Sequence, residues 1–400
     1  MVDDPVLLLE GPRSVGKSTL LRELAQRAGG MVVDLDDPAT RDAALADPAL
    51  FVSGSSPVFL DEYQKAPVLL DAIKAELNRD SRPGRFVLTG STRHDALPAA
   101  TQSLTGRLSR LTVYPLSQGE IAQHRESLLE RLFSNASETI AGLASPTTRE
   151  QYLLRVMAGG FPLALARVAG AARSRWFDDY LHLTLQRDVP DLSHIRQPDL
   201  LPEFLQRLAG QTAQVLNVTR ASTDAGLAPR TGEHYTRLLE AVFLIHRLPA
   251  WGKTLSSRAT GTPKIHLLDS GLAARLLRLT PEKLARRDPT SLTELGHLLE
   301  TFVVGELLKQ ASWLESINAG HWRTSDGAEV DLVLERDDGA IVAFEVKSSG
   351  RVTGKDFAGL RKLRAATGSA FLAGVALYTG EWSFTMEDRL FALPIDRLWS

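Results

Sequence analysis

The chain has 400 residues, 44% of them apolar and 24% charged, with a formal net charge of −2 and no cysteine. These values are typical of globular proteins, and they exclude disulfides, cysteine-ligated zinc and an overall electrostatic attraction to nucleic acid. The length suggests about two to four domains. Apolar runs stay below the roughly 18 residues of a membrane helix, and the start lacks the basic segment of a signal peptide. We therefore expect a cytoplasmic protein with no membrane partner.

The strongest motif lies near the N-terminus, where an apolar strand over residues 6–10 leads into a glycine-rich loop and a helix over residues 18–27. The loop sequence GPRSVGKS fits the pattern G-x-x-x-x-G-K-[ST], whose backbone N–H groups surround nucleotide phosphates. We predict an ATP site here, with Lys17 on the β- and γ-phosphates and the Ser18 hydroxyl on Mg²⁺. The predicted binding residues are Gly11, Pro12, Arg13, Ser14, Val15, Gly16, Lys17, Ser18 and Thr19.

A second apolar strand, residues 58–60, ends in two acids, Asp61 and Glu62. This pattern predicts that Asp61 holds Mg²⁺ through water and that Glu62 is the general base for the attacking water. The alternative is a capped strand end with two solvated carboxylates. A third strand lies within GRFVLTGSTR, residues 84–93, and ends in small polar residues. We expect Ser91 to orient that water, with Thr89 as the other candidate.

The order of glycine loop, acidic strand and polar strand is that of P-loop ATPases. It predicts an α/β domain over residues 1–125, with a parallel sheet covered by helices on both faces. Residues 32–48 fit the second strand of that sheet and its helix. Arg107 follows a glycine and precedes another apolar strand. It is a candidate arginine finger, in cis or from a neighbouring subunit of a homo-oligomer, or else a surface arginine.

The middle of the chain contains two segments with different patterns of apolar residues. Residues 126–195 show apolar residues at spacings of three and four, which predicts a helical lid. Its arginines indicate either a basic contact surface or a solvated helix face; they are Arg149, Arg155, Arg167, Arg173, Arg175 and Arg187.

Residues 196–285 predict three helices followed by two strands, the arrangement of a winged helix. The second helix of its helix-turn-helix would present Arg230, Thr231, His234 and Arg237. Such a face can enter a DNA groove, but a winged helix attached to an ATPase can equally be a rigid protein-contact module.

The C-terminal part, residues 286–400, contains a helix and then a hairpin of the strands EVDLVLE and AIVAFEVK. If Arg336 pairs with Ala340 across the turn, Asp331 lies opposite Glu345, and Lys347 lies on the same face as Glu345. Two carboxylates this close repel each other unless a cation neutralises them.

Oxygen ligands of this kind favour Mg²⁺ or Mn²⁺, which would polarise a phosphodiester while Lys347 steadies the attacking water. The preceding helix adds Glu300, at the edge of its apolar stripe, and Glu306, inside it. A carboxylate within an apolar stripe needs a partner, so we predict the metal or Lys347 beside Glu306. The predicted metal ligands are Glu300, Glu306, Asp331 and Glu345. The alternative is a solvated hairpin with a structural Lys–Glu pair.

Both ends of the chain resemble a group of bacterial and archaeal ATPases that join an AAA-type P-loop domain to a C-terminal domain of unknown function similar to PD-(D/E)XK nucleases. The N-terminal motifs are GPRSVGKST, LDEYQKAP, FVLTGST and LTGR…YPLSQGE, and the C-terminal motifs are LLETFVVGEL, GAEVDLVLE and FEVKSS. The resemblance covers essentially the whole chain. It implies a nuclease-like α/β fold in which Glu300 is the helix acid and Asp331, Glu345 and Lys347 form the D…E-x-K core.

Two functions follow as hypotheses. The first is an ATP-regulated enzyme that acts on DNA and cuts it at a Mg²⁺-dependent C-terminal site. The second is a nucleotide-dependent switch that binds DNA or a partner protein without cleavage, which the near-neutral charge favours. A processive helicase-like motor is the weaker third reading, because no additional motor motif is present.

Overall fold

The computed structural model describes residues 3–54, 57–96, 104–140, 144–193, 195–252, 254, 261–286, 288–314 and 316–400. The chain divides into two compact units. The first unit comprises Met1–Pro115, Leu183–Arg196 and Arg237–Leu244, and the second comprises Leu116–His182, Gln197–Thr236 and Ile245–Ser400. Apart from Thr254, the predicted hairpin turn at 253–260 lies outside the described residues. Within the described ranges, no helix combines the length and apolar character needed to cross a membrane.

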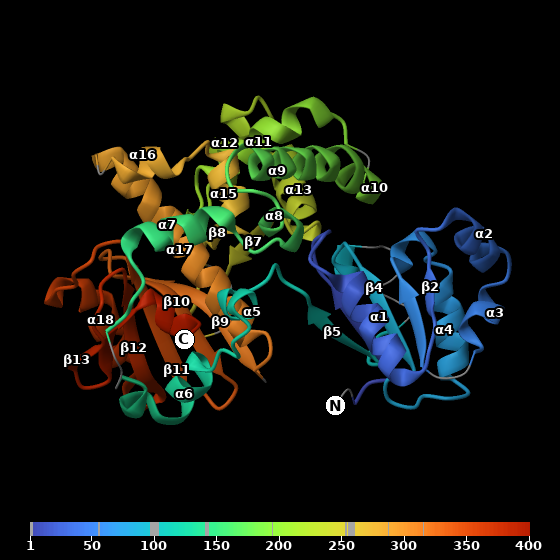
Figure 1. Ribbon diagram of the computed structural model, residues 1–400, viewed down its shortest axis with the longest axis horizontal. Coiled ribbons are helices and arrows are strands. Elements are labelled where there is room, and N and C mark those ends of the chain that lie inside the picture. Colours follow the sequence, from blue (N-terminus) through green and yellow to red (C-terminus); the bar gives the residue numbers. More distant parts are fainter. Residues whose placement is uncertain are drawn as a thin grey trace. The chain divides into compact units, whose positions relative to one another are not determined.

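The first unit contains a five-stranded sheet in the order β2-β3-β4-β1-β5, in which every neighbouring pair is parallel (Figure 1). Its strands are β1 Val6–Glu10, β2 Val32–Asp34, β3 Val58–Asp61, β4 Phe86–Gly90 and β5 Leu108–Thr112. Its helices include α1 Lys17–Ala28, α2 Pro38–Ala46, α3 Pro48–Val52, α4 Leu69–Leu77 and α10 Val189–Leu192. The predicted parallel α/β fold is confirmed.

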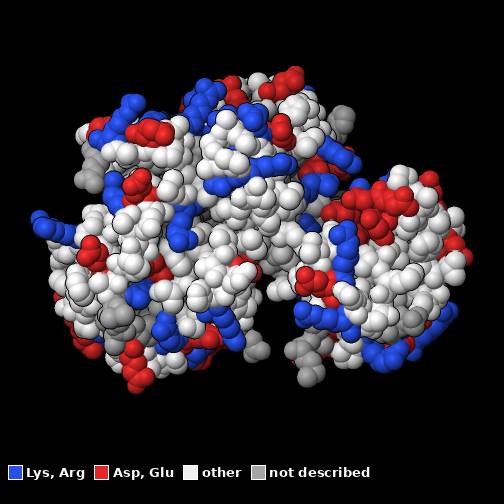
Figure 2. All heavy atoms as spheres, in the orientation of Figure 1, with Lys and Arg blue, Asp and Glu red and all other residues white. Residues whose placement is uncertain are grey.

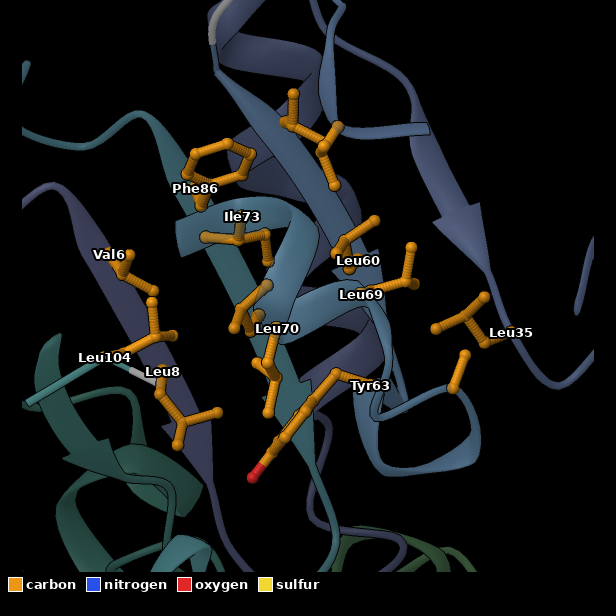
Figure 3. Close-up of a cluster of buried hydrophobic side chains, with 14 of the residues drawn as sticks. Val6, Leu8, Leu35, Leu60, Tyr63, Leu69, Leu70, Ile73, Phe86 and Leu104 are labelled. Atoms are coloured by element: carbon orange, nitrogen blue, oxygen red, sulfur yellow. The ribbon is translucent and has the colours of Figure 1, made fainter. Parts of the chain in front are cut away.

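Side-chain alternation along the strands builds a core on each face of this sheet. Val6 and Leu8 of β1 point to the face where α4 packs with Leu70 and Ile73 (Figure 3). Leu9, on the other face, packs in a second cluster with residues of α1. Because both faces are covered there, the central strands β1, β3 and β4 begin as continuous apolar runs, as in other buried parallel sheets.

The second unit contains two sheets. The smaller is antiparallel, in the order β6-β8-β7, and accompanies three helices. The larger has six strands in the order β13-β14-β12-β11-β10-β9 and mixes parallel with antiparallel pairs. The elements of the smaller part are α11 Leu201–Ala209, β6 Gln214–Val215, α12 Val218–Asp224, β7 Ile245–Leu248, β8 Lys264–Leu267 and α13 Pro229–Ala241, whose end from Arg237 belongs to the first unit. Those of the larger part are α17 Pro289–Ala311, β9 Ile317–Arg323, β10 Glu329–Arg336, β11 Ile341–Lys347, α18 Ala358–Thr367, β12 Phe371–Tyr378, β13 Phe384–Glu387 and β14 Leu390–Pro394.

The helices between residues 116 and 182 belong to the second unit, which differs from the predicted lid over 126–195. They are α5 Gln118–Ala122, α6 Leu128–Asn135, α7 Arg149–Ala158, α8 Pro162–Leu165 and α9 Ala171–Leu183. The physical reason is the apolar face of α6, where Leu129, Leu132 and Phe133 are buried and the helix lies against β11 and β12. Likewise, α7 packs against α15 Ser270–Leu276, α16 Pro281–Ala285 and α17.

Candidate functional site

The glycine loop lies between the end of β1 and the start of α1. Ser14 and Gly16 have left-handed backbone conformations, with φ of 64° and 102°. A Cβ atom at Gly11 would lie 2.2 Å from the Val113 carbonyl oxygen, so this position accepts only glycine. Gly16 caps α1 without a side-chain hydrogen bond, which leaves the first N–H groups of a 12-residue helix for an anion.

Lys17 is held inside this loop. Its side chain is nearly buried, and its Nζ donates to the carbonyl oxygens of Gly11 and Pro12 at 2.9 and 2.7 Å. Burial lowers the pKa of Lys17 to about 8. Nucleotide phosphates would offset that burial cost, because opposite charge favours the protonated amine. The loop therefore fits a phosphate chain both in shape and in charge.

The ends of β3 and β4 bring four predicted residues together. The Thr89 hydroxyl donates to the Asp61 carboxylate and accepts from the Glu62 N–H at 3.0 Å. The Ser91 hydroxyl donates to Glu62 Oε2 at 3.1 Å. The Ser91 hydroxyl thus contacts the Glu62 carboxylate, whereas the Thr89 hydroxyl contacts Asp61 and the Glu62 N–H; the role of Ser91 in orienting the water stays a prediction.

Gln64 completes this constellation, although the sequence did not single it out. Its Nε2 donates to Ser91 Oγ at 2.9 Å and also to the Glu62 carboxylate. Glu62 itself has a left-handed backbone, with φ of 55°. Uncommon backbone conformations of this kind concentrate at functional sites, because surrounding structure must hold them. The fixed carboxylate suits a general base.

Two arginines tie the nucleotide loops to later segments of the first unit. Arg13 Nε donates to Asp188 Oδ2 at 2.7 Å, and Asp188 ends a π-helical turn, Thr184–Asp188. Arg93 donates from its backbone N–H to the Ala241 carbonyl at 2.9 Å and from Nε to the Glu240 carbonyl at 3.1 Å. Sequence reasoning missed both contacts, because the partners are 175 and 147 residues away.

Arg107 lies at the opposite edge of the sheet from the glycine loop. β5 runs parallel to β1, with Leu108 opposite Val6 and Thr112 opposite Glu10. Since the loop follows Glu10, Arg107 is about 17 Å away at about 3.3 Å per residue. Its guanidinium donates to Asn78 Oδ1 at 2.9 Å. The prediction of a finger in cis is therefore wrong, whereas a role in trans within a homo-oligomer stays a prediction.

The predicted hairpin register is confirmed. The Arg336 N–H donates to the Ala340 carbonyl at 2.9 Å, and the ladder continues to Leu332 opposite Phe344. Asp331 is the next position, and its Oδ2 accepts from the Val346 N–H at 2.9 Å. Lys347 Nζ donates to Glu345 Oε1 at 2.7 Å. Asp331, Glu345 and Lys347 thus gather at one end of β10 and β11.

A lysine that the sequence analysis did not select lies among these acids. Lys264 of β8 places its Nζ 2.8 Å from Glu300, 2.7 Å from Glu329 and 3.0 Å from Asp331. Its side chain is only 2% exposed. Burial opposes its charge, but Asp331 and Glu300 outweigh burial and raise the pKa of Lys264.

Two sequence signals pointed to this arrangement. Lys264 begins the apolar run KIHLL, where a lysine is a candidate for a buried ion pair. Glu329 lies two residues before Asp331 in one strand and so shares its face.

Two carboxylates of this cluster have raised pKa values. Burial, followed by the charge of Asp331, raises the pKa of Glu345 to about 8. The same two causes raise the pKa of Glu300. A cavity of about 460 Å³ opens beside the cluster, lined by Lys264, His297, Glu300, Arg323, Glu329 and Glu345 among others.

The predicted metal ligands do not form a metal site in this arrangement. Among the described residues, no group of three or more histidine, aspartate or glutamate side chains is placed to hold a metal ion. The Lys264 ammonium lies where Glu300 and Asp331 converge, and it neutralises them. The prediction of Mg²⁺ or Mn²⁺ on Glu300, Asp331 and Glu345 is therefore corrected to a lysine-neutralised cluster.

Glu306 is not part of this cluster. Its Oε1 accepts from Lys309 Nζ at 2.6 Å, and its Oε2 accepts from the Gln118 N–H at 2.6 Å. The prediction that it binds a metal or Lys347 is wrong. The buried carboxylate does have partners. They are Lys309, one turn further along α17, and the N–H of Gln118 in α5. Glu300, one of the two candidates, is the acid that faces Asp331.

The candidate DNA-reading face lies on α13. Arg230 and Arg237 are exposed, and Thr231 and His234 are half-buried. A Cβ atom at Gly232 would lie 1.8 Å from Ser222 Oγ, so glycine allows α12 and α13 to approach closely. The close packing of α12 against α13 therefore fixes the position of the exposed Arg230 and Arg237.

Comparison with known proteins identifies the N-terminal part. Residues 3–122 match the model of the AAA domain, and residues 149–283 and 295–398 match two models described as domains of unknown function. With the loop geometry above, the AAA match shows that the chain contains a P-loop ATPase domain and is an ATP-hydrolysing enzyme.

Relatives and solved structures add little about function. The uncharacterized proteins Rv2008c of Mycobacterium tuberculosis and Mb2031c of Mycobacterium bovis are each 28% identical over 398 residues, covering 98% of this chain and 81% of theirs. The Walker-type ATPase of Pyrococcus abyssi is 15% identical, with a TM-score of 0.40 over 68% of this chain and 91% of that one. The Thermotoga maritima RuvB Holliday junction branch migration motor is 16% identical, with a TM-score of 0.27 over 62% and 82%. At these TM-scores, neither likeness carries an argument.

Proposed function

We propose that this ATPase is a nucleotide-controlled switch that acts on DNA. The observation that carries the proposal is the composition of the first unit. Besides the P-loop sheet, it contains Leu183–Arg196, which continues α9, and Arg237–Leu244, which includes the end of α13. The other parts of both helices belong to the second unit. Through α9 and α13, the chain thus runs continuously between the first unit, which contains the nucleotide loops, and the second unit.

The first route begins at Arg13 inside the glycine loop. Its ion pair with Asp188 is mostly buried, with side-chain exposures of 30% and 9%. A bound nucleotide would bring phosphate charge close to Arg13 and compete with Asp188 for the guanidinium. Weakening this pair would release the π-helical turn that follows α9.

The second route begins at Ser91, beside the predicted base Glu62. Two residues later, Arg93 holds the end of α13 through two backbone carbonyls and lies 4.9 Å from the ring centre of Phe243. A shift of the Ser91 loop during hydrolysis would therefore pull on α13. Such contacts transmit a conformational change only if the element that they hold can adopt two arrangements. The proposal therefore requires that α13 has two arrangements.

We assign α11, α12, α13 and the β6-β8-β7 sheet to a winged helix that contacts DNA. The supporting observations are the element order, the close α12–α13 pair and the exposed Arg230 and Arg237. Figure 2 shows further lysine and arginine side chains around α9. Phosphate contacts by such residues would make binding depend on salt. Contact with a protein instead of DNA is the outcome that would replace this assignment.

The chain's own residues fit the hydrolysis step. ATP with Mg²⁺ supplies the phosphoryl group, and Ser18 and Asp61 are the residues that would hold the metal. Glu62 would accept the proton of the attacking water, and Ser91 and Gln64 hold its carboxylate in place. Lys17 would exchange its two carbonyl partners for phosphate oxygens.

DNA cleavage is the second candidate function. One observation supports it, namely that the ladder reaches Leu332 opposite Phe344, next to Asp331 and to the Glu345–Lys347 ion pair. The ammonium of Lys264 on Asp331 and Glu300 argues against a metal-loaded nuclease site in this arrangement. We therefore rank the switch above the nuclease.

One gel experiment separates these functions. The protein is incubated with labelled single-stranded, duplex and branched DNA, with Mg²⁺ or Mn²⁺, and with or without ATP. The switch predicts an ATP-dependent band shift that Lys17→Ala abolishes and Lys347→Ala retains, with no shorter products. Arg79→Ala, at an exposed arginine of the first unit, is the matched control. Products that disappear in Lys347→Ala would establish the nuclease instead, and the absence of any shift would refute DNA binding.

A further inference from the structure

The C-terminal cluster collects four acids around two lysines. Glu300 comes from α17, Glu329 and Asp331 come from β10, and Glu345 comes from β11. Among the described residues, Lys264 is the cation at their centre, with its Nζ within 3.0 Å of three of the four carboxylates, and Lys347 pairs with the fourth, Glu345. Without this ammonium, the remaining charges would repel each other strongly in a buried place.

Glu345 shows that the cluster is built for more positive charge. Its Oε1 accepts from Lys347, but its Oε2 is buried and has no hydrogen-bond partner within the described part of the chain. It lines the same 460 Å³ cavity as Lys264 and Glu300. A buried carboxylate oxygen facing a polar cavity points to a cationic ligand or a proton at that position.

The geometry around Lys264 Nζ is close to that of an oxygen-coordinated cation. The three oxygen distances are 2.7 to 3.0 Å. Mg²⁺ binds oxygens at about 2.0–2.1 Å, so the same three oxygens would need to close in by about 0.6 to 1.0 Å. Small side-chain rotations supply such a movement, provided that the ammonium is gone.

We propose that Lys264 occupies the position of a divalent cation in the C-terminal site and keeps that site free of metal. The lysine belongs to β8, the middle strand of the β6-β8-β7 sheet, whereas the acids belong to α17 and the larger sheet. The site therefore becomes able to bind a cation only when residue 264 is shortened or β8 withdraws. This inference does not depend on whether the protein binds DNA.

The test measures Mn²⁺ binding to nucleotide-free protein by the loss of the free-ion EPR signal. Wild type should bind no Mn²⁺ at the cluster, and Lys264→Ala should gain one site per chain. Asp331→Asn added to Lys264→Ala should abolish the gain. Lys264→Arg, which keeps the charge, should stay without the site. Lys309→Met is the matched control, because it removes another buried lysine that pairs with only one acid, Glu306.

Lys264→Ala can be less stable than wild type, so a second measurement compares the melting temperature of each protein with and without Mn²⁺. Mn²⁺ should raise the melting temperature of Lys264→Ala and leave that of wild type unchanged, because a ligand stabilises only the state that binds it. The proposal is overturned if Lys264→Ala gains no site. It is equally overturned if wild type already binds Mn²⁺ in a way that Asp331→Asn abolishes.

Discussion

Replacing Glu306 by glutamine distinguishes a structural carboxylate from a metal ligand. Glu306 is almost completely buried, and it accepts from Lys309 Nζ and from the Gln118 N–H, both at 2.6 Å. The Lys309 side chain is itself only 10% exposed, and its second acceptor is the Leu116 carbonyl at 3.0 Å. The substitution keeps the size of the side chain but leaves a buried ammonium without its counter-charge.

The expected loss follows from these contacts. Removing one partner of a buried ion pair costs about 3–5 kcal/mol. In Glu306→Gln, the side-chain oxygen can still accept from the Gln118 N–H, and the Leu116 carbonyl still accepts from Lys309. We therefore expect the lower end of that range, about 3 kcal/mol, in the unfolding free energy of the second unit. Adding Lys309→Met removes the stranded charge, so the double variant should recover about half of that loss.

Tryptophan fluorescence during urea unfolding is the assay, because every tryptophan of the chain belongs to the second unit. These residues are Trp176, Trp251, Trp313, Trp322, Trp382 and Trp399. Wild type, both single variants and the double variant complete a double-mutant cycle.

The reasoning would be refuted by a loss below about 1 kcal/mol in Glu306→Gln, the range of an exposed ion pair. It would also be refuted if the two losses simply added in the double variant, because a buried ion pair must show coupling.

Three further predictions concern the two candidate sites. Lys17→Ala should lose ATP binding in a filter assay, whereas Glu62→Gln should bind ATP and hydrolyse it about 10²–10⁴-fold more slowly. Arg107→Ala should leave hydrolysis unchanged at protein concentrations where the chain is monomeric; a loss there would contradict the placement of Arg107 at the far edge of the sheet. The folded pKa of Glu345 is raised to about 8, so its contribution to stability is present below about pH 4.5 and is lost as the pH rises through 8. Wild type should therefore lose up to about 3 kcal/mol between about pH 5 and pH 8, and Glu345→Gln should not; equal pH profiles would contradict the burial of this charge.

Local patterns predicted most of the nucleotide site and the hairpin. The glycine loop, its strand and its helix are adjacent in sequence, so their arrangement follows from one motif. The hairpin register was also predictable, because a short turn between Arg336 and Ala340 fixes the pairs that follow it up to Leu332 and Phe344. Where both partners lie within one supersecondary unit, the sequence was sufficient.

The remaining site residues depend on contacts across the chain. Lys264 meets Asp331 across 67 residues, and Arg13 meets Asp188 across 175. Arg107 was misplaced because it precedes its strand, and in a parallel sheet the start of one strand lies at the end opposite the loop that follows its neighbour. Helix periodicity put Glu306 in the buried stripe correctly, but it did not reveal that Lys309 and the Gln118 N–H supply its partners.

The measurement that tests the central claim most directly is the DNA affinity of Glu62→Gln in ATP and in ADP, by fluorescence anisotropy at one salt concentration. The nucleotide-controlled switch predicts dissociation constants that differ by about tenfold or more, a typical coupling between two sites. Charge reversal of Arg230 and Arg237 should weaken binding in both states. Equal dissociation constants in ATP and ADP, with DNA still bound, would contradict the account.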